Sequence, residues 1–221
     1  MSREIINNGE GGLSVRNKLN SNFYEKFVET ITIAEYTGDL LTRSDNPSVL
    51  RLANGNLIMG FQGFSGAVAD TGLATFYICL STDDGATWST PVKQFESLGT
   101  TGTYNPSLYQ RLDGSVFAIL LVQQSPATSD LWKVESNDGG LTFSGTQSII
   151  WEGGSNYAAP APNRIYRTMS GRLLYPFNIA LTGDLSSQTG TYQGRILKSD
   201  DDGVTWSLNA GIATAESNAL F

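Results

Sequence analysis

Ser81-Thr-Asp-Asp-Gly-Ala-Thr-Trp88 is a phrase that the chain repeats twice, as Ser136-Asn-Asp-Gly-Gly-Leu-Thr-Phe143 and as Ser199-Asp-Asp-Asp-Gly-Val-Thr-Trp206. We name these segments octets 1, 2 and 3. They share the pattern S-x-D-x-G-x-T-(W/F), and they recur about every sixty residues along the chain. A phrase repeated at a nearly constant spacing indicates a protein built from similar structural units that stack side by side.

The residues before each octet follow the same order in all three units. A proline phrase comes first, an arginine follows, and a glycine then marks a turn. These positions are Pro47, Arg51 and Gly55, then Pro106, Arg111 and Gly114, then Pro162, Arg167 and Gly171. A continuous apolar run follows each glycine, which is typical of a strand buried on both faces. Together with the strands on either side of the octet, each unit is predicted to contain four short antiparallel strands.

A small four-stranded sheet with apolar faces must stack on its neighbours, and this describes a blade of a β-propeller. We therefore predict an all-β fold in which residues 42–221 hold three four-stranded blades and the start of a fourth. The predicted blades cover about residues 45–98, 104–152, 160–213 and 214–221. An open stack of three blades would expose an apolar face. We expect this part either to belong to a larger ring or to bury that face against another copy.

Each octet is predicted to make the hairpin between the third and fourth strands of its unit. Its glycine permits a positive-φ turn, and its aspartate and hydroxyl side chains suit hydrogen bonds to the turn backbone. We therefore assign Asp83, Asp138 and Asp201 to holding the fold rather than to catalysis. The acidic run 200–202 offers oxygen ligands for Ca²⁺, but a solvated turn is favoured because no bidentate glutamate follows at loop spacing.

The composition narrows the classes of partner. The net charge is −7 and no basic cluster is present, which argues against nucleic acid and leaves neutral or polar ligands such as sugars. The chain has no histidine and a single cysteine, Cys79, so we expect a buried free thiol, no metal site and no cofactor. No apolar stretch approaches a membrane span and no signal peptide is evident, so we expect a soluble protein without membrane insertion.

Residues 1–41 are predicted to form a separate N-terminal segment with one helix and one strand. Apolar residues recur every four positions, and so lie along one stripe of a helix, at Val15, Leu19, Phe23 and Phe27. Residues 28–36 are rich in β-branched side chains, which favours a strand. The phrase over residues 8–23 resembles the N-terminal segment of many tailed-phage tail-fibre and virion proteins, where it precedes a receptor-binding or enzymatic domain. An ordinary capping helix is the alternative interpretation.

The octets resemble the Asp-box, or BNR repeat, of sialidases, and the resemblance covers residues 45–213. It implies a propeller of the six-bladed sialidase type, of which three blades are found here. Sialidases cleave terminal sialic acid with retention of configuration. They hold the sugar carboxylate with three arginines, and they use an aspartate acid/base and a tyrosine nucleophile that a glutamate activates.

The resemblance places some of these parts on this chain. The family's first arginine lies in an Arg-Ile-Pro phrase, but the matching phrase here is 45–47, Asp-Asn-Pro, so the nearest substitute is Arg43. Asp70, in the loop before octet 1, fits the place of the acid/base. Glu216, where the fourth blade would open, fits the place of the glutamate. The other two arginines and the tyrosine would come from blades four to six.

Further candidates for binding a sugar are polar or aromatic. Arg164 follows Asn163 in a phrase that resembles one seen in some sialidase-like propellers, and its charge is expected to face the central cleft. Tyr104 and Tyr157 are expected to be exposed in loops, where they would contact a glycan. Each candidate also has a structural interpretation, such as capping a turn or pairing with a neighbouring charge, and both interpretations stay open.

The sequence leaves three functions open. The first is a propeller of a phage virion, or of the extracellular space, that recognises host-surface glycans, including those with sialic acid. The second is an exo-sialidase or related retaining glycoside hydrolase that is active only in a longer or assembled form. The third is a purely structural tail component. The expected partners are glycans and other copies of the chain or other virion proteins.

Overall fold

The structure is a computed structural model that describes residues 41–65, 73–95, 98, 102–180, 191–209 and 213–216, all of them in strands or loops. The chain divides into two compact units, Met1–Ile33 and Ala34–Phe221, and the described residues all belong to the second. The predicted N-terminal helix and strand, and the predicted acid/base Asp70, lie outside the described residues. None of the described residues forms a helix of the length and hydrophobicity that a membrane span needs.

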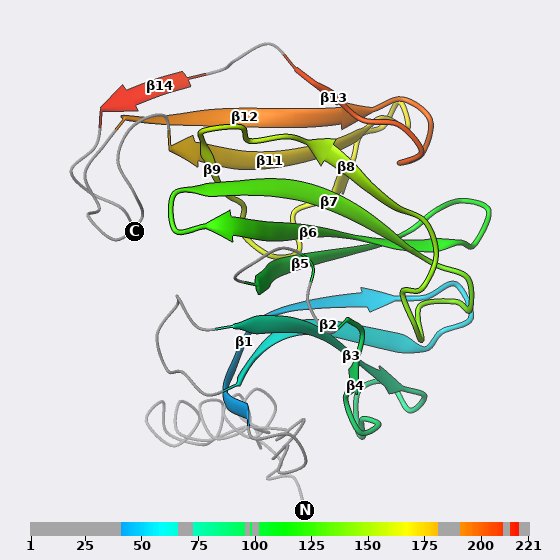
Figure 1. The fold of residues 1–221 in the computed structure, drawn as a ribbon. Coiled ribbons are helices and arrows are strands. Elements are labelled where there is room, and N and C mark those ends of the chain that lie inside the picture. Colours follow the sequence, from blue (N-terminus) through cyan, green and yellow to red (C-terminus); the bar gives the residue numbers. More distant parts are fainter. Residues whose placement is uncertain are drawn as a thin grey trace, which may run out of the picture. The chain divides into compact units, whose positions relative to one another are not determined.

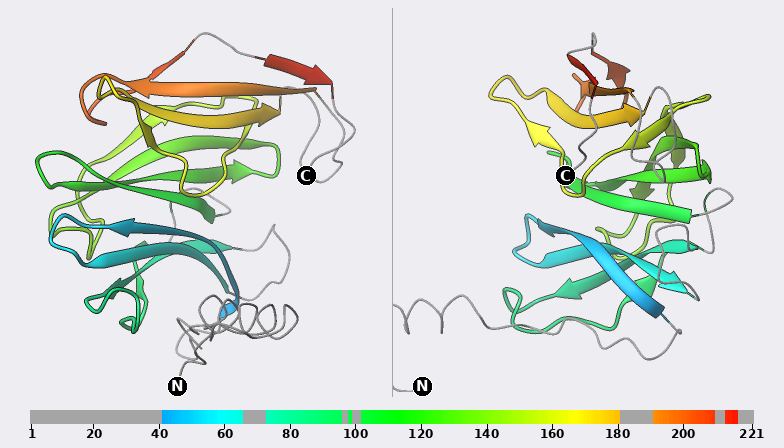
Figure 2. Two further views of the ribbon diagram at one scale, coloured as in Figure 1. Left: turned by 180° about the vertical axis from the view of Figure 1, so that it is seen from behind. Right: turned by 90° about the vertical axis from the view of Figure 1, so that its left-hand side faces the viewer.

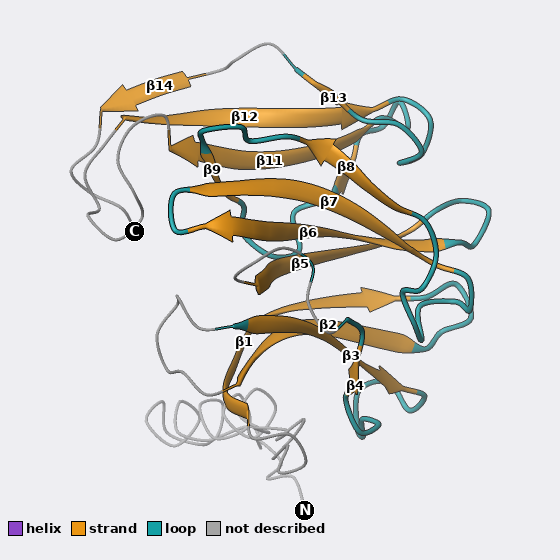
Figure 3. Cartoon of the chain, viewed as in Figure 1, coloured by secondary structure: helices purple, strands orange, loops and turns teal. Residues whose placement is uncertain are grey.

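The described residues form fourteen strands, shown in Figure 1 and, by type of secondary structure, in Figure 3. Their bounds are β1 (Leu41–Arg51), β2 (Leu57–Ser65), β3 (Ala74–Ser81), β4 (Val92–Lys93), β5 (Gly102–Gln110), β6 (Val116–Ser125), β7 (Thr128–Ser136), β8 (Gln147–Trp151), β9 (Tyr157–Ala159), β10 (Tyr166–Arg167), β11 (Leu173–Ala180), β12 (Thr191–Ser199), β13 (Ser207–Leu208) and β14 (Ala213–Glu216). The turn glycines and the octets found in the sequence lie at the connections between successive strands.

Antiparallel pairing between successive strands groups them into three meanders. The first is β1-β2-β3-β4, and the second is β5-β6-β7-β8. In the third, β9 and β10 both pair with β11, which pairs with β12. A single parallel bridge, Ala74 to Gly102, joins the first meander to the second. Figure 2 shows the three meanders following one another in chain order. The first two meanders thus have four strands each.

The last described strand, β14, overlaps the first residues of the predicted fourth blade, 214–221. Strand β14 pairs with Thr191–Gly194 of β12, and β13 pairs with Leu197 and Lys198 of the same strand. The two short strands therefore form one interrupted edge of the third meander. After leaving β13, the chain rejoins the same edge because the remaining backbone groups of β12 still need hydrogen-bond partners.

Strand β6 lies at the centre of the core. Its residues from Val116 to Val122 are all buried, and alternate side chains belong to two different hydrophobic clusters. Phe117, Ile119 and Leu121 share a cluster with residues of β11 and β12, whereas the intervening side chains share one with Ile58 of β2 and Phe76 of β3. Because successive side chains on a strand point to opposite faces, this unbroken apolar run packs the second meander against both neighbours.

The outer face of the third meander differs from the corresponding faces of the first two. Ile58 and Phe117 occupy the second positions of β2 and β6 and are fully buried, whereas Leu174, at the same place in β11, is only half-buried. Tyr109 pairs with Phe117 and packs on the core, whereas Tyr166 pairs with Leu174 and is 62% exposed. The described residues therefore leave this face uncovered.

Candidate functional site

The three octets fold into the same hydrogen-bonded turn. In each, the serine hydroxyl donates to the aspartate and accepts the glycine N–H, while the threonine donates to the aspartate through its N–H and its hydroxyl. The bonded sets are Ser81, Asp83, Gly85 and Thr87; Ser136, Asp138, Gly140 and Thr142; and Ser199, Asp201, Gly203 and Thr205. The octet aspartates are thus engaged in holding their own turns.

Hydrogen bonding also fixes the charge state of these aspartates. At Asp201, burial favours the neutral form, but bonds from Thr205 and Ser199 outweigh it and lower the pKa to about 2. The pKa of Asp138 is lowered in the same way, by Thr142 and Ser136 against burial. A general acid needs a proton near neutral pH, so these carboxylates are unsuited to that task.

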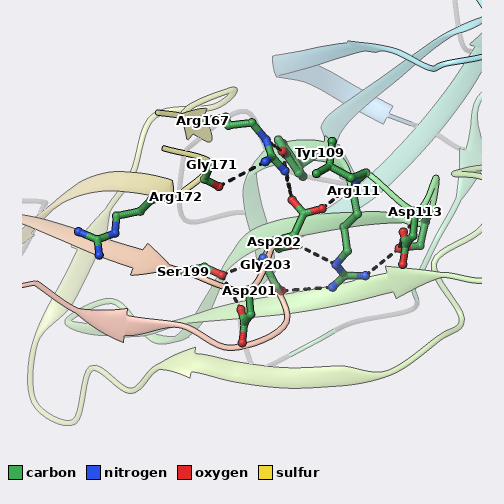
Figure 4. Close-up of polar contacts among 12 residues, drawn as sticks. Tyr109, Arg111, Asp113, Arg167, Gly171, Arg172, Ser199, Asp201, Asp202 and Gly203 are labelled. Carbon is green, nitrogen blue, oxygen red and sulfur yellow. Dashed lines mark hydrogen bonds and ion pairs between the residues drawn. The ribbon is translucent and has the colours of Figure 1, made fainter. Parts of the chain in front are cut away.

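Octet 3 is also tied to the second meander through Asp202 (Figure 4). Its carboxylate forms an ion pair with Arg167, and it accepts hydrogen bonds from the Tyr109 hydroxyl at 3.4 Å and from the Leu112 N–H at 2.7 Å. Arg167 in turn donates to the Tyr109 hydroxyl at 2.7 Å. These contacts join the octet to the β5–β6 hairpin, so the acidic run of octet 3 connects two meanders.

A second group of charges lies beside this contact. Arg111 donates from Nε to the Asp202 carbonyl at 3.0 Å and forms an ion pair of 2.6 Å with Glu135. Lys133 lies 3.1 Å from the same glutamate and donates to the Val204 carbonyl at 2.7 Å. Burial opposes the charged form of Glu135, but the two cations outweigh it and lower its pKa. These charges serve the contact between meanders, because every one of them has a protein partner.

The first strands of the three meanders converge, and we name this convergence of β1, β5, β9 and β10 the inner edge. The Asn46 amide donates to the Asn105 side chain at 2.6 Å, and the Asn105 amide donates to the Pro160 carbonyl at 2.8 Å. The Ser48 hydroxyl donates to the Asn163 side-chain carbonyl at 3.5 Å. The inner edge therefore brings polar side chains from all three meanders to one place.

Backbone geometry explains why asparagines occupy these positions. Asn46, Asn105 and Asn163 have φ angles of 52°, 53° and 55°, in the left-handed region. Asparagine tolerates that region better than most side chains. In β1 and β5 the asparagine lies at a bulge, between Asp45 and Ser48 and between Tyr104 and Ser107 respectively. The bulges interrupt the regular pairing and turn these amides toward the neighbouring meanders.

Arg43, the predicted substitute for the family's first arginine, lies on β1 at the inner edge. Its Nε is 3.1 Å from Asp45 Oδ2, and its guanidinium carbon is 4.0 Å from the centre of the Phe64 ring. Asp45 is a functional candidate that sequence reasoning passed over. The signal was present, because Asp45 occupies the place of the family's arginine and alternates with Arg43 along one strand.

The two predicted glycan-binding tyrosines are not exposed loop residues. Tyr104 lies on β5 and Tyr157 on β9, and each is 6% exposed. Both belong to a core cluster that draws residues from all three meanders, and the Tyr104 ring is 5.9 Å from that of Phe64 on β2. The expectation of exposure was wrong because the segments 102–104 and 157–159 pair into strands whose side chains face a neighbouring meander.

The remaining predicted site residues are not gathered into one arrangement by the described contacts. Asn163 and Arg164 are both exposed, and the Arg164 N–H donates to the Ser107 hydroxyl at 3.2 Å. Glu216 ends β14, where its backbone pairs with Thr191. A retaining hydrolase needs two catalytic groups held about 5 Å apart. Asp45 is the one carboxylate on the inner-edge strands β1, β5, β9 and β10. Among the described residues, no group of three or more His, Cys, Asp or Glu could hold a metal ion.

Solved structures with a similar fold include two sialidases and an arabinanase. Hadza microbial sialidase Hz136 aligns with 79% of this chain and 39% of its own, at 16% identity and a TM-score of 0.63. A leech intramolecular trans-sialidase aligns with 78% of this chain and 44% of its own, at 13% identity and a TM-score of 0.60. An alpha-L-arabinanase of Penicillium chrysogenum, complexed with arabinobiose, aligns with 80% and 51%, at 18% identity and a TM-score of 0.55.

The chain thus spans between 39% and 51% of the length of these three proteins. No family model and no curated protein matches its sequence. Identities this low establish the architecture and not the activity. The chain has the all-β fold of sialidase- and arabinanase-type β-propellers.

Proposed function

We propose that this protein recognises glycans through a sialidase-type β-propeller. The observation that carries the proposal is the inner edge, where amide and hydroxyl side chains of three meanders converge within a fold shared with sialidases and an arabinanase. Sugars present many hydroxyl groups, each of which both donates and accepts hydrogen bonds, and amide side chains supply both partners. The net charge of −7 suits a sugar better than a polyanion.

Glycan-array binding of the fluorescently labelled chain tests this proposal. We expect binding to at least one glycan class and a loss of at least tenfold for Asn105→Ala, which removes the central amide of the inner edge. The matched control is Asp113→Ala, in the exposed β5–β6 turn. Absence of binding to every glycan on the array, with a folded protein, would refute the proposal.

A glycoside hydrolase is the second candidate function, and the identity of the structural neighbours favours it, since they are sialidases and an arabinanase. In this proposal Asp70 is the acid/base and Glu216 activates a nucleophile, with the rest of the site supplied by further blades of a six-bladed ring. A second copy or a longer chain would supply those blades. The uncovered face beside Tyr166 and Leu174 supports such an arrangement.

Turnover of chromogenic sialosides and arabinosides separates the two candidates. An enzyme is expected to release the chromophore and to lose at least 100-fold in rate with Asp70→Asn, while Asp113→Asn leaves the rate unchanged. Glycan binding with no turnover on either substrate would leave the binding module as the function.

The site of action is proposed to be a phage virion, on the resemblance of residues 8–23 to tail-fibre segments. In that setting the N-terminal unit would attach to other virion proteins and the propeller would meet the host surface. Co-purification of the full chain with assembled particles, compared with a chain lacking residues 1–33, tests the attachment. Equal recovery of both chains with the particles would contradict it.

A further inference from the structure

The charges at the inner edge indicate which class of sugar it can bind. This inference rests on the proposed glycan-binding function. Arg43 and Asp45 are two residues apart on β1 and form an ion pair of 3.1 Å. Their side chains are 27% and 34% exposed. Partial burial weakens the screening that water provides, so the pair holds its two charges together more firmly than a fully exposed pair would.

A second contact fixes the arginine in this position. The Arg43 guanidinium lies 4.0 Å from the centre of the Phe64 ring, a cation–π arrangement, and Phe64 is fully buried in the core. The ring itself packs against Tyr104. Turning Arg43 toward a ligand would therefore break both the ion pair and the ring contact.

A sugar carboxylate would meet an unfavourable charge at this place. It requires a cation that is free to receive it, but the Arg43 charge is already balanced by Asp45. The Asp45 carboxylate would repel a second anion at close range. Arg164, which is exposed, is a second arginine close to the inner edge. It lies in the loop before β10, and its N–H donates to the Ser107 hydroxyl.

The amides of the inner edge suit a neutral ligand instead. Asn46 uses its amide N–H toward Asn105, and Asn163 uses its carbonyl toward Ser48. No described residue bonds to the Asn46 carbonyl or to the Asn163 amide N–H, which leaves one acceptor and one donor. A hydroxyl group both donates and accepts, so each of these two groups can bond to a sugar hydroxyl without any charge.

We infer that the inner edge accepts a neutral sugar, a pentose or hexose without a carboxylate, and discriminates against sialic acid through the Arg43–Asp45 pair. Isothermal titration calorimetry on the full chain tests this, with arabinobiose, xylobiose and lactose as neutral probes and 3′-sialyllactose as the anionic probe. At least one neutral probe is expected to bind at least tenfold more tightly than 3′-sialyllactose. The comparison uses the unmodified chain, so it does not depend on the folding of a variant.

The variant Asp45→Asn tests the role of the ion pair. It removes the repelling charge and leaves the Arg43 charge unbalanced by Asp45, so we expect the affinity for 3′-sialyllactose to rise about fivefold or more, with neutral-sugar binding within twofold of the original. Tighter binding of 3′-sialyllactose than of every neutral probe by the unmodified chain would overturn the inference and leave glycan recognition intact. A loss of that binding in Arg164→Gln would then identify Arg164 as the receptor for the carboxylate. Failure of all four probes and of the glycan array would overturn the proposed function and this inference with it.

Discussion

Replacing Gly203 of octet 3 by alanine tests whether the octets fasten one meander to the next. Gly203 has a φ of +86°, and a Cβ added there would lie 2.6 Å from Cε1 and from Cζ of Phe117, on the second meander. Phe117 is fully buried, with Trp206 and Tyr109 packed around its ring. The ring cannot move away from the new methyl group without disturbing the core.

The magnitude follows from two separable costs. A left-handed φ costs an alanine about 1–2 kcal/mol, and forcing an extra methyl group into a packed core costs about 1–3 kcal/mol more. Gly114 provides the control, because its φ is +89° but no atom lies within 4 Å of its Cβ position. Gly114→Ala should therefore carry only the first cost. Gly140→Ala should fall between the two, because its Cβ would meet the flexible end of Ile58 at 2.8 Å.

Thermal unfolding of the three variants measures the difference. For a chain of this size, each kcal/mol lowers the melting temperature by about 2–4 °C. Gly203→Ala should thus melt about 2–12 °C below Gly114→Ala. Equal melting temperatures for these two variants would refute the reasoning, since they would mean that octet 3 does not press on the second meander.

Three further predictions concern ionisable groups. Asp202→Asn should lower the free energy of unfolding by about 1–3 kcal/mol in urea titrations, because the Asp202 carboxylate joins two meanders. The control is Asp84→Asn, at the same octet position but in an exposed ion pair, which should change the free energy of unfolding by no more than about 0.5 kcal/mol. The pKa of Asp201 is lowered to about 2 from 3.8, so the stability that its carboxylate contributes is complete above about pH 4 and is lost as the pH falls toward 2. In Asp201→Asn the urea midpoint should therefore depend less on pH over that range. An unchanged dependence of the midpoint on pH would contradict this. Burial raises the pKa of Cys79 to about 12, so iodoacetamide at pH 8 should modify it only after unfolding, as mass spectrometry would reveal.

Much of the fold could be predicted from the sequence because its signals are local. The octet closes its own turn through bonds among residues at most four apart, so the pattern of Ser, Asp, Gly and Thr is sufficient to recognise it. The long apolar run of β6 likewise predicts burial on both faces, which the two clusters that it joins confirm. The turn at Gly114 also predicts where β6 begins, since the strand starts at Val116.

The site was harder to predict because it depends on contacts between repeats. The burial of Tyr104 and Tyr157 arises from packing between meanders, and no local pattern distinguishes them from exposed loop aromatics. The alternation of Arg43 and Asp45 along one strand is visible in the sequence, but their ion pair is a finding of the structure. The pairing of β14 with β12 was also beyond local reasoning, because it depends on which backbone groups were left without partners.

The hydrogen bonds of the inner edge have a consequence for how such a chain could change in length over evolution. The Leu108 N–H donates to the Ser48 hydroxyl, and the Arg164 N–H donates to that of Ser107, so the serine in each of the first two repeats accepts a bond from the backbone of the next repeat. A duplicate of such a repeat would carry both the serine that accepts a bond from the following repeat and the backbone N–H that donates to the preceding one. Gain or loss of whole repeats of about sixty residues would thus preserve these bonds, whereas an insertion of part of a repeat would separate an octet from the meander that it closes.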